Sequence, residues 1–186
     1  MKTRISALTL LSTVVLSSSA LAQGWEMGPA FKDGWKPEFT VAAVVGSINI
    51  DDISGSETYT GLELSLNCPW FQPPSGTIRQ QFNLGNYDKN GIEVSAIEMN
   101  PNYFVTISPG LTWGFGPGIG YSRVSYLNGP SEGLWSVQAS TNLNYRNGAL
   151  FMGAGARYQA TQDDTIAPGV KGLDNWLFTA KVGLNF

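Results

Sequence analysis

The sequence of 186 residues contains no histidine and a single cysteine, Cys68. Histidine is the side chain that most often serves as a general base near neutral pH, and no GxSxG segment, phosphate-binding loop or cluster of metal ligands replaces it. One thiol cannot form a disulfide within the chain, and a small buried side chain is favoured for Cys68 over a reactive thiol. We therefore expect no enzymatic activity, no cofactor and no bound metal.

Basic residues are also few, with 11 Lys and Arg against 14 Asp and Glu. Two of them, Lys2 and Arg4, precede an uncharged run over 5–22 that is rich in Leu, Val, Ser and Ala. This run ends in a small-x-small sequence at Ala22, which is the pattern of a secretory signal peptide. Cleavage near Ala22 leaves a more acidic chain, and this argues against nucleic acid as a partner.

Beyond the signal peptide, no apolar run is long enough for a transmembrane helix. If the chain spans a membrane, it must do so as a closed barrel, since lipid offers no partner for open sheet edges. The last eleven residues, 176–186, show the required alternation, with an apolar side chain at every second position. Segment 135–145 alternates equally well. A period of two is typical of a strand with one apolar and one mixed face.

Eight such segments follow one another along the chain, separated by turn or loop sequences. They are 39–50, 59–68, 77–86, 92–108, 111–121, 135–145, 150–160 and 176–186. The first is apolar on both phases, so its faces cannot be assigned. Splitting 92–108 at Pro101 would leave a short stub and an odd count, whereas bacterial single-chain barrels have even counts. We therefore keep one strand and expect a bulge or a local opening at Pro101.

Three parts are expected along the chain. Residues 1–22 form the signal peptide, and residues 23–37 form an irregular periplasmic lead-in that is either disordered or plugs the lower mouth of a barrel. Residues 38–186 form an all-β, eight-stranded, antiparallel up-and-down transmembrane barrel with both termini in the periplasm. A soluble periplasmic β-sandwich is the alternative fold, in which the apolar faces would pack on each other.

Three short segments carry a family resemblance. They are Gly-Phe-Gly-Pro-Gly-Ile-Gly-Tyr over 114–121, Gly-Ala-Gly-Ala-Arg-Tyr over 153–158, and Val-Gly-Leu-Asn-Phe over 182–186. With them the chain resembles the small outer-membrane β-barrel proteins of the OmpA-like, opacity-like and OmpW-like type. The resemblance implies location in the outer membrane of a Gram-negative envelope, contact with its lipids and lipopolysaccharide, and recognition by the barrel-assembly machinery through the strand ending at Phe186.

The strand phases place five charged side chains on the inward face: Glu63, Arg79, Glu98, Arg157 and Lys181. The interior of an eight-stranded barrel is only wide enough for its own side chains. We expect Glu63 to pair with Lys181 and Glu98 with Arg157, and glycines 114, 116, 118, 120, 153 and 155 to make room for these long side chains. The pairs form either a closed polar core, favoured because an unpaired buried charge is expensive, or a gate whose disruption would raise conductance.

The predicted role is therefore structural or surface-interacting, with an interior closed by polar side chains. Acidic residues in the expected loops suit a host or environmental surface ligand or a divalent cation, although no loop has the ligand spacing of a dedicated cation site. Solvated loops explain these acids as well. The alternative function is a narrow porin-like channel for small solutes or hydrophobic ligands.

Overall fold

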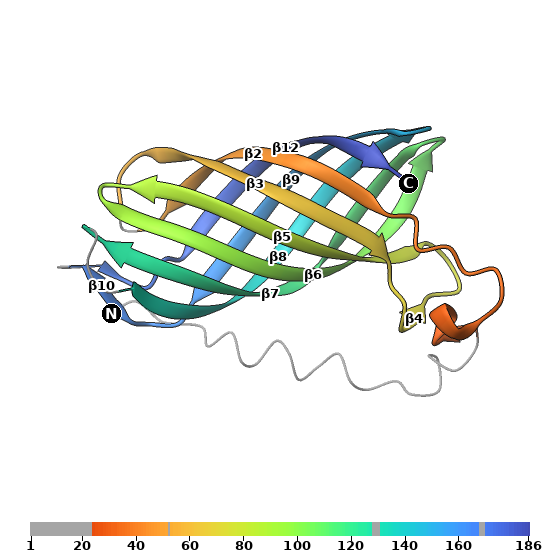
Figure 1. The fold of residues 1–186 in the computed structure, drawn as a ribbon, viewed down its shortest axis with the longest axis horizontal. Helices are drawn as coiled ribbons and strands as arrows, with labels where there is room; N and C mark the ends of the chain where they lie inside the picture. The colour runs from red at the N-terminus through yellow and green to blue at the C-terminus, as the bar shows by residue number, and fades with distance from the viewer. Residues whose placement is uncertain (1–23, 52, 128–130, 168–169) are drawn as a thin grey trace.

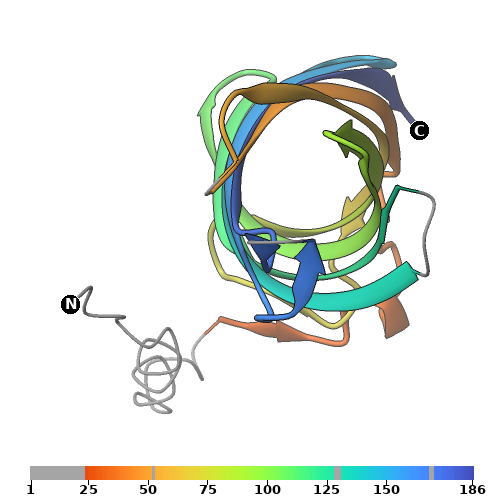
Figure 2. The ribbon, with the colours of Figure 1, turned by 90° about the vertical axis from the view of Figure 1, so that its left-hand side faces the viewer.

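The computed structural model describes residues 24–51, 53–127, 131–167 and 170–186, and the expected signal peptide lies outside them. Within these residues, eight antiparallel strands close into a barrel in the order β12-β2-β3-β5-β6-β7-β8-β9. Figure 1 shows the barrel from the side, and Figure 2 shows it along its axis as a closed ring. The predicted eight-stranded barrel is confirmed, and the β-sandwich alternative is wrong.

The barrel strands contain the eight predicted segments almost completely. They are β2 (Thr40–Ile50), β3 (Ser56–Asn67), β5 (Thr77–Lys89), β6 (Ile92–Ser108), β7 (Leu111–Tyr126), β8 (Ser131–Asn147), β9 (Leu150–Thr161) and β12 (Asn175–Asn185). Thr40 pairs with Asn185 at one end of the barrel, which we call the terminal end. Ile50 pairs with Asn175 at the other end, which we call the loop end. Several strands continue further toward the loop end than the sequence indicated, so that β8 and its neighbour β7 extend beyond β9.

Side chains alternate strictly between the interior and the outer surface of the barrel. In β2, whose faces the sequence left open, Ala42, Val44 and Ile48 are buried inside, whereas Val41 and Val45 are exposed outside. The other strands also carry exposed apolar residues on their outer faces. No helix among the described residues is both long and apolar enough to cross a bilayer.

Strand β6 runs unbroken through Pro101, as predicted. It pairs with β5 at this point, but its pairing with β7 stops at Met99↔Ile119 and resumes at Tyr103↔Phe115. This register places Pro101 directly opposite Pro117. Neither proline has an N–H group, so no ladder hydrogen bond can form between them. The local opening expected at Pro101 is therefore confirmed, and its cause is a pair of prolines.

Replacing both prolines by valine should stabilise the barrel. The two new N–H groups can complete the ladder, and each net hydrogen bond contributes about 1 kcal/mol, so we expect a gain of about 1–2 kcal/mol. Urea unfolding of the refolded protein in detergent measures this gain as a higher midpoint at an unchanged slope. An equal or lower midpoint for Pro101→Val/Pro117→Val would contradict the assigned register.

The lead-in is ordered in the described residues and is fastened to the turn between β3 and β5. Its strand β1 (Glu26–Met27) pairs with β4 (Phe71–Gln72) in that turn, and a single turn of 3-10 helix, η2 (Pro29–Phe31), follows. The Gly28 N–H donates to the Trp70 carbonyl at 2.6 Å. The sequence did not predict this pairing, because a two-residue strand is too short to show a period.

Cys68 lies at the start of the same turn. Its side chain is buried, and its backbone N–H donates to the Ile78 carbonyl at 2.8 Å. The buried position favoured for this thiol is therefore confirmed.

The loop between β9 and β12 contains a second short hairpin. In it, β10 (Thr165–Ala167) pairs with β11 (Val170–Lys171). Figure 1 shows β10 at the loop end of the barrel, opposite the end where the C-terminus lies.

Candidate functional site

Two ion pairs lie inside the barrel. Lys181 Nζ lies 2.5 Å from Glu63 Oε2, and Arg157 Nη1 contacts Glu98 Oε1. All four side chains are at most 10% exposed. The first pair reaches across the intervening strand β2, and the second joins β6 to β9 on distant parts of the ring. The structure thus brings together both pairs that the strand phases predicted.

The first ion pair belongs to a wider polar network. The Gln81 side-chain amide donates to Glu63 Oε1 at 3.1 Å, and Lys181 Nζ also donates to Asn142 Oδ1 at 2.8 Å. The Asn102 amide in turn donates to Gln81 Oε1. Because these residues come from five different strands, the network holds the two sides of the barrel together through its interior.

Arg79 does not join the other four charged residues. It is buried at the terminal end, where Nη1 donates to Asn67 Oδ1 at 2.8 Å and Nη2 donates to the Glu38 carbonyl at 2.6 Å. Its Nη1 also lies 3.6 Å from the exposed Glu38 carboxylate. Arg79 therefore attaches Glu38, the residue that follows the lead-in, to the barrel mouth, and nothing in this geometry makes Arg79 part of a central gate.

A small polar cavity lies between the two ion pairs. Its volume is about 40 Å³, and its lining includes Glu98, Asn100, Arg157 and Lys181. The side-chain oxygen of Asn100 is buried and has no hydrogen-bond partner among the described residues. A water needs about 10–15 Å³ measured in this way, so the cavity has room for a few waters but not for a solute of sugar or amino-acid size.

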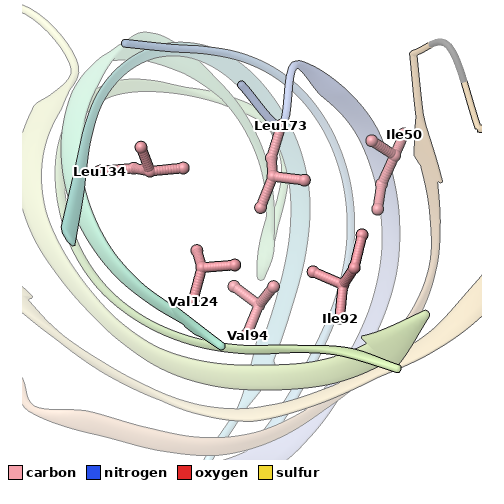
Figure 3. Close-up of a cluster of buried hydrophobic side chains, with 6 residues drawn as sticks. All are labelled: Ile50, Ile92, Val94, Val124, Leu134 and Leu173. Atoms are coloured by element: carbon pink, nitrogen blue, oxygen red, sulfur yellow. The ribbon is translucent and has the colours of Figure 1, made fainter. Parts of the chain in front are cut away.

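Toward the loop end the interior contains an apolar cluster that the sequence did not predict. Six buried side chains, each at most 5% exposed, form one cluster: Ile50, Ile92, Val94, Val124, Leu134 and Leu173. Figure 3 shows them around the inside of the ring, with Leu173 contributed by the loop between β9 and β12. A second cluster contains Val44, Ile48, Tyr59 and Leu177. We call the first cluster, defined by its six residues, the apolar layer.

The apolar layer could have been found by extending the inward phase. Val94 shares the phase of Glu98, and Val124 shares that of Gly120, but the predicted strand containing Gly120 ended before residue 124. Leu173 had no such signal because it belongs to a loop. This residue is held in place by Thr161, whose hydroxyl accepts from the Leu173 N–H at 2.6 Å. The Asp174 carboxylate accepts from the Thr161 N–H at 2.7 Å and thereby fixes the same corner.

The interior glycines make room mainly for amides, which corrects the expectation that they accommodate the charged side chains. A Cβ on Gly118 would collide with Asn100 Oδ1, and a Cβ on Gly155 would lie 2.7 Å from Asn142 Oδ1. Gly114 lies similarly against Phe104, Gly116 against Asn102, and Gly153 against Asn144. At Gly120 a Cβ would lie 2.6 Å from Ser136 Oγ and 3.4 Å from Glu98 Cγ, so this glycine makes room chiefly for a serine hydroxyl. The short, branched asparagine side chains fill the interior between the ion pairs and the wall.

The acidic loop residues form no metal site in the part of the chain that the structure describes. No group of three or more potential ligands of the His, Cys, Asp or Glu type lies together there. Asp174 is used internally, and Glu57 lies 3.5 Å from the buried Lys89. Asp88, Glu93 and Glu132 are exposed at the loop end.

Comparison with known proteins places this architecture among solved barrels. Neither a protein-family model nor a curated protein sequence matches the chain. The crystal structure of Neisserial surface protein A (NspA) matches at a TM-score of 0.60 with 14% identity, covering 80% of this chain and 96% of that one. The N-terminal β-barrel domain of Pseudomonas aeruginosa OprF matches at 0.55 with 14% identity, over 81% and 100%.

The attachment invasion locus protein Ail of Yersinia pestis matches at a TM-score of 0.53 with 11% identity, over 82% of this chain and 100% of that one. Identities this low speak to the fold alone. All three proteins are small outer-membrane barrels of eight strands. The chain therefore has the fold of the small, OmpA-like outer-membrane β-barrels, as its sequence pattern indicated.

Proposed function

We propose that the protein is a non-enzymatic, integral β-barrel of the cell outer membrane, with a structural or surface-interacting role and a closed interior. The fold shared with OprF, Ail and NspA supports this proposal. So does the outer surface, where Leu62, Ile97 and Val182 are each more than half exposed. An apolar surface of this extent is stable against lipid and unfavourable against water.

The observation that carries the closed interior is that the lumen is filled at two successive levels. The ion pairs and their amide network occupy the middle of the barrel, with a cavity of only about 40 Å³ between them. The apolar layer follows toward the loop end and is completed by Leu173. A hydrophobic constriction excludes ions because it dewets, so each level alone is a barrier to conduction.

The proposed orientation has both termini in the periplasm, after export and cleavage near Ala22. The exposed apolar side chains on the outer surface of the barrel would contact outer-membrane lipids and lipopolysaccharide. Strand β12, which ends beside the exposed Phe186, would be recognised by the barrel-assembly machinery. The loop end would then face the outside. Its exposed acids, including Asp88 and Glu132, suit contact with a basic host or environmental surface.

Single-channel recording of the refolded mature protein in a planar bilayer tests the closed interior. We expect a silent protein that is nevertheless folded, which a shift in gel mobility on heating verifies. Discrete and reproducible openings would contradict the closed interior and favour the alternative, a narrow porin-like channel. The matched positive control is a larger porin reconstituted in the same bilayers.

One observation favours a variant of that alternative, a site for hydrophobic ligands. Aliphatic side chains of the apolar layer line the interior at the loop end, and Leu173 is the member of this layer that comes from the loop between β9 and β12. An apolar molecule displacing Leu173 would meet Ile50, Ile92 and Leu134. Binding of a fluorescent fatty acid that is lost in Leu134→Asp would support this role, and absence of any binding would count against it.

A further inference from the structure

An exposed apolar surface lies at the terminal end of the molecule, outside the barrel proper. It is formed by the lead-in, over 24–31, and by the turn between β3 and β5, over 69–72, and we call it the platform. Four of its apolar side chains are exposed: Met27 by 71%, Phe31 by 92%, Trp70 by 55% and Phe71 by 37%. These side chains lie on two segments that pair with each other, and exposed apolar groups close together mark a site of interaction.

The platform is held in a defined conformation by contacts between its two segments. Its two segments pair through β1 and β4, and the Ala30 N–H donates to the Pro69 carbonyl at 3.3 Å. The Trp25 and Phe71 rings lie with centroids 6.4 Å apart, and Glu26 and Lys32 form an ion pair at 2.8 Å. These contacts hold Phe31 and Trp70 on the surface, although the apolar side chains themselves gain little from being there.

The turn that carries half of the platform folds over the outside of the barrel wall. Ile78 and Gln80 have the outward phase of β5, yet they are only 8% and 3% exposed. The Gln72 side chain accepts from the Ile78 N–H at 2.9 Å and donates to the Ile78 carbonyl at 2.8 Å. A polar residue such as Gln80 on the outward face is explained by this cover, since the turn shields it from the surroundings.

The same turn is joined to the aromatic residues on the outer surface of the barrel. The Tyr103 hydroxyl donates to the Ser75 carbonyl at 3.1 Å, and the Tyr103 ring packs edge-on against Phe115 at 5.9 Å. Phe115 in turn contacts Trp113 at 5.3 Å. These residues have the outward phase of β6 and β7 at the terminal end, where aromatic rings prefer the membrane–water boundary. The platform therefore continues the lipid-facing surface.

The view along the axis agrees with this placement. In Figure 2 the orange lead-in runs along the outside of the ring and does not cross its opening. A segment in this position lies over the lipid that would surround the barrel, and it leaves the mouth of the lumen uncovered.

We propose that the platform rests on the phospholipid leaflet bordering the terminal end, with Met27, Phe31 and Trp70 inserted at the boundary between headgroups and acyl chains. Aromatic and apolar side chains presented by a fixed structure are stabilised at this boundary. The ion pair between Glu26 and Lys32 balances the local charge, so a phospholipid surface is not repelled. The inference rests on the proposed membrane insertion of the barrel, and it adds a second, peripheral membrane contact.

A fluorescent probe on the platform tests this contact. In a Cys68→Ser background, Phe31→Cys is labelled with an environment-sensitive NBD group, and the full mature protein is refolded into phosphatidylcholine vesicles. We expect blue-shifted emission and several-fold stronger quenching by lipids with a nitroxide on the acyl chain than by an aqueous quencher. The control is Asn147→Cys, exposed at the same end but outside the platform, for which we expect the aqueous quencher to dominate.

A second measurement avoids the new cysteine. Brominated lipids quench tryptophan, and the difference in quenching between the unchanged chain and Trp70→Phe isolates the contribution of Trp70. Strong quenching of Trp70 supports the platform, and no difference overturns it.

Two further outcomes would also overturn the inference. A probe at position 31 that is quenched only from the aqueous phase shows a platform surrounded by water. A blue shift that needs high protein-to-lipid ratios, without quenching by nitroxide lipid, shows a second copy of the chain as the partner. A protein that neither floats with vesicles nor shifts in the gel on heating would contradict the proposed membrane insertion of the barrel. Failure of the platform contact and failure of membrane insertion are therefore distinguishable.

Discussion

Replacing Lys181 by methionine should lower the free energy of unfolding of the barrel by about 3–5 kcal/mol. The ammonium group lies 2.5 Å from Glu63 Oε2, and the Glu63 side chain is only 1% exposed. Methionine has a similar length, so the change removes the positive charge with little loss of volume. Among the described residues, Glu63 then keeps the Gln81 side-chain amide as a donor, and an uncompensated buried carboxylate is strongly destabilising.

The double variant Glu63→Gln/Lys181→Met separates the charge from the packing. Once both charges are removed, no uncompensated ion remains, and most of the lost stability should return. Urea unfolding in detergent, followed by tryptophan fluorescence, measures all variants. As a control, Glu26→Gln breaks an ion pair that is about half exposed, and it should change the stability by less than about 1 kcal/mol. A Lys181→Met protein as stable as the double variant would refute the structural role of this pair.

Removing all four charges of the two ion pairs should leave the barrel non-conducting, whereas opening the apolar layer as well should produce channels. The first variant carries serine at positions 63, 98, 157 and 181, and the second adds Leu134→Ser and Leu173→Ser. The two levels act as barriers in series, so opening the polar level alone leaves a dry constriction at the loop end. We expect a change from silence to discrete openings only when both levels are opened.

Planar-bilayer recordings of these variants give the readout, after heat-dependent gel mobility has shown that each protein is folded. The variant with Leu134→Ser and Leu173→Ser alone should also be silent, because the ion pairs still fill the middle of the barrel. Openings in the four-serine variant would contradict the role of the apolar layer as a barrier to ions. They would instead assign the gate to the ion pairs, which was the alternative function that the sequence left open for them.

The alternation along the chain determined which residues face inward, and this was enough to predict the ion pairs. An inward Glu63 and an inward Lys181 share a narrow interior, where each long side chain must find a partner or remain unpaired. The eight strands followed from the same alternation, together with the turn sequences between them. Even the local opening at Pro101 was predictable, since proline cannot donate to a ladder.

Three features were decided only by the tertiary structure. Leu173 completes the apolar layer from a loop that has no period, and the loop is positioned by its hydrogen bonds with Thr161. The partner of each interior glycine depends on the register between strands, which is why Gly118 meets Asn100 and not a charged residue. The pairing of β1 with β4 joins segments far apart in the chain through only two residues each.

The sequence by itself thus determined the eight barrel strands, the faces of all but the first, and the charged residues that share the interior, because a period of two is a local property of the chain. Only the closed barrel decided how far each strand extends toward the loop end, which side chains fill the interior at each level and where the lead-in lies. These depend on contacts between residues distant in sequence, such as Gly118 with Asn100 and Trp70 with Gly28. Local patterns carry no record of such contacts, since they form only when the strands adopt one register and the barrel closes.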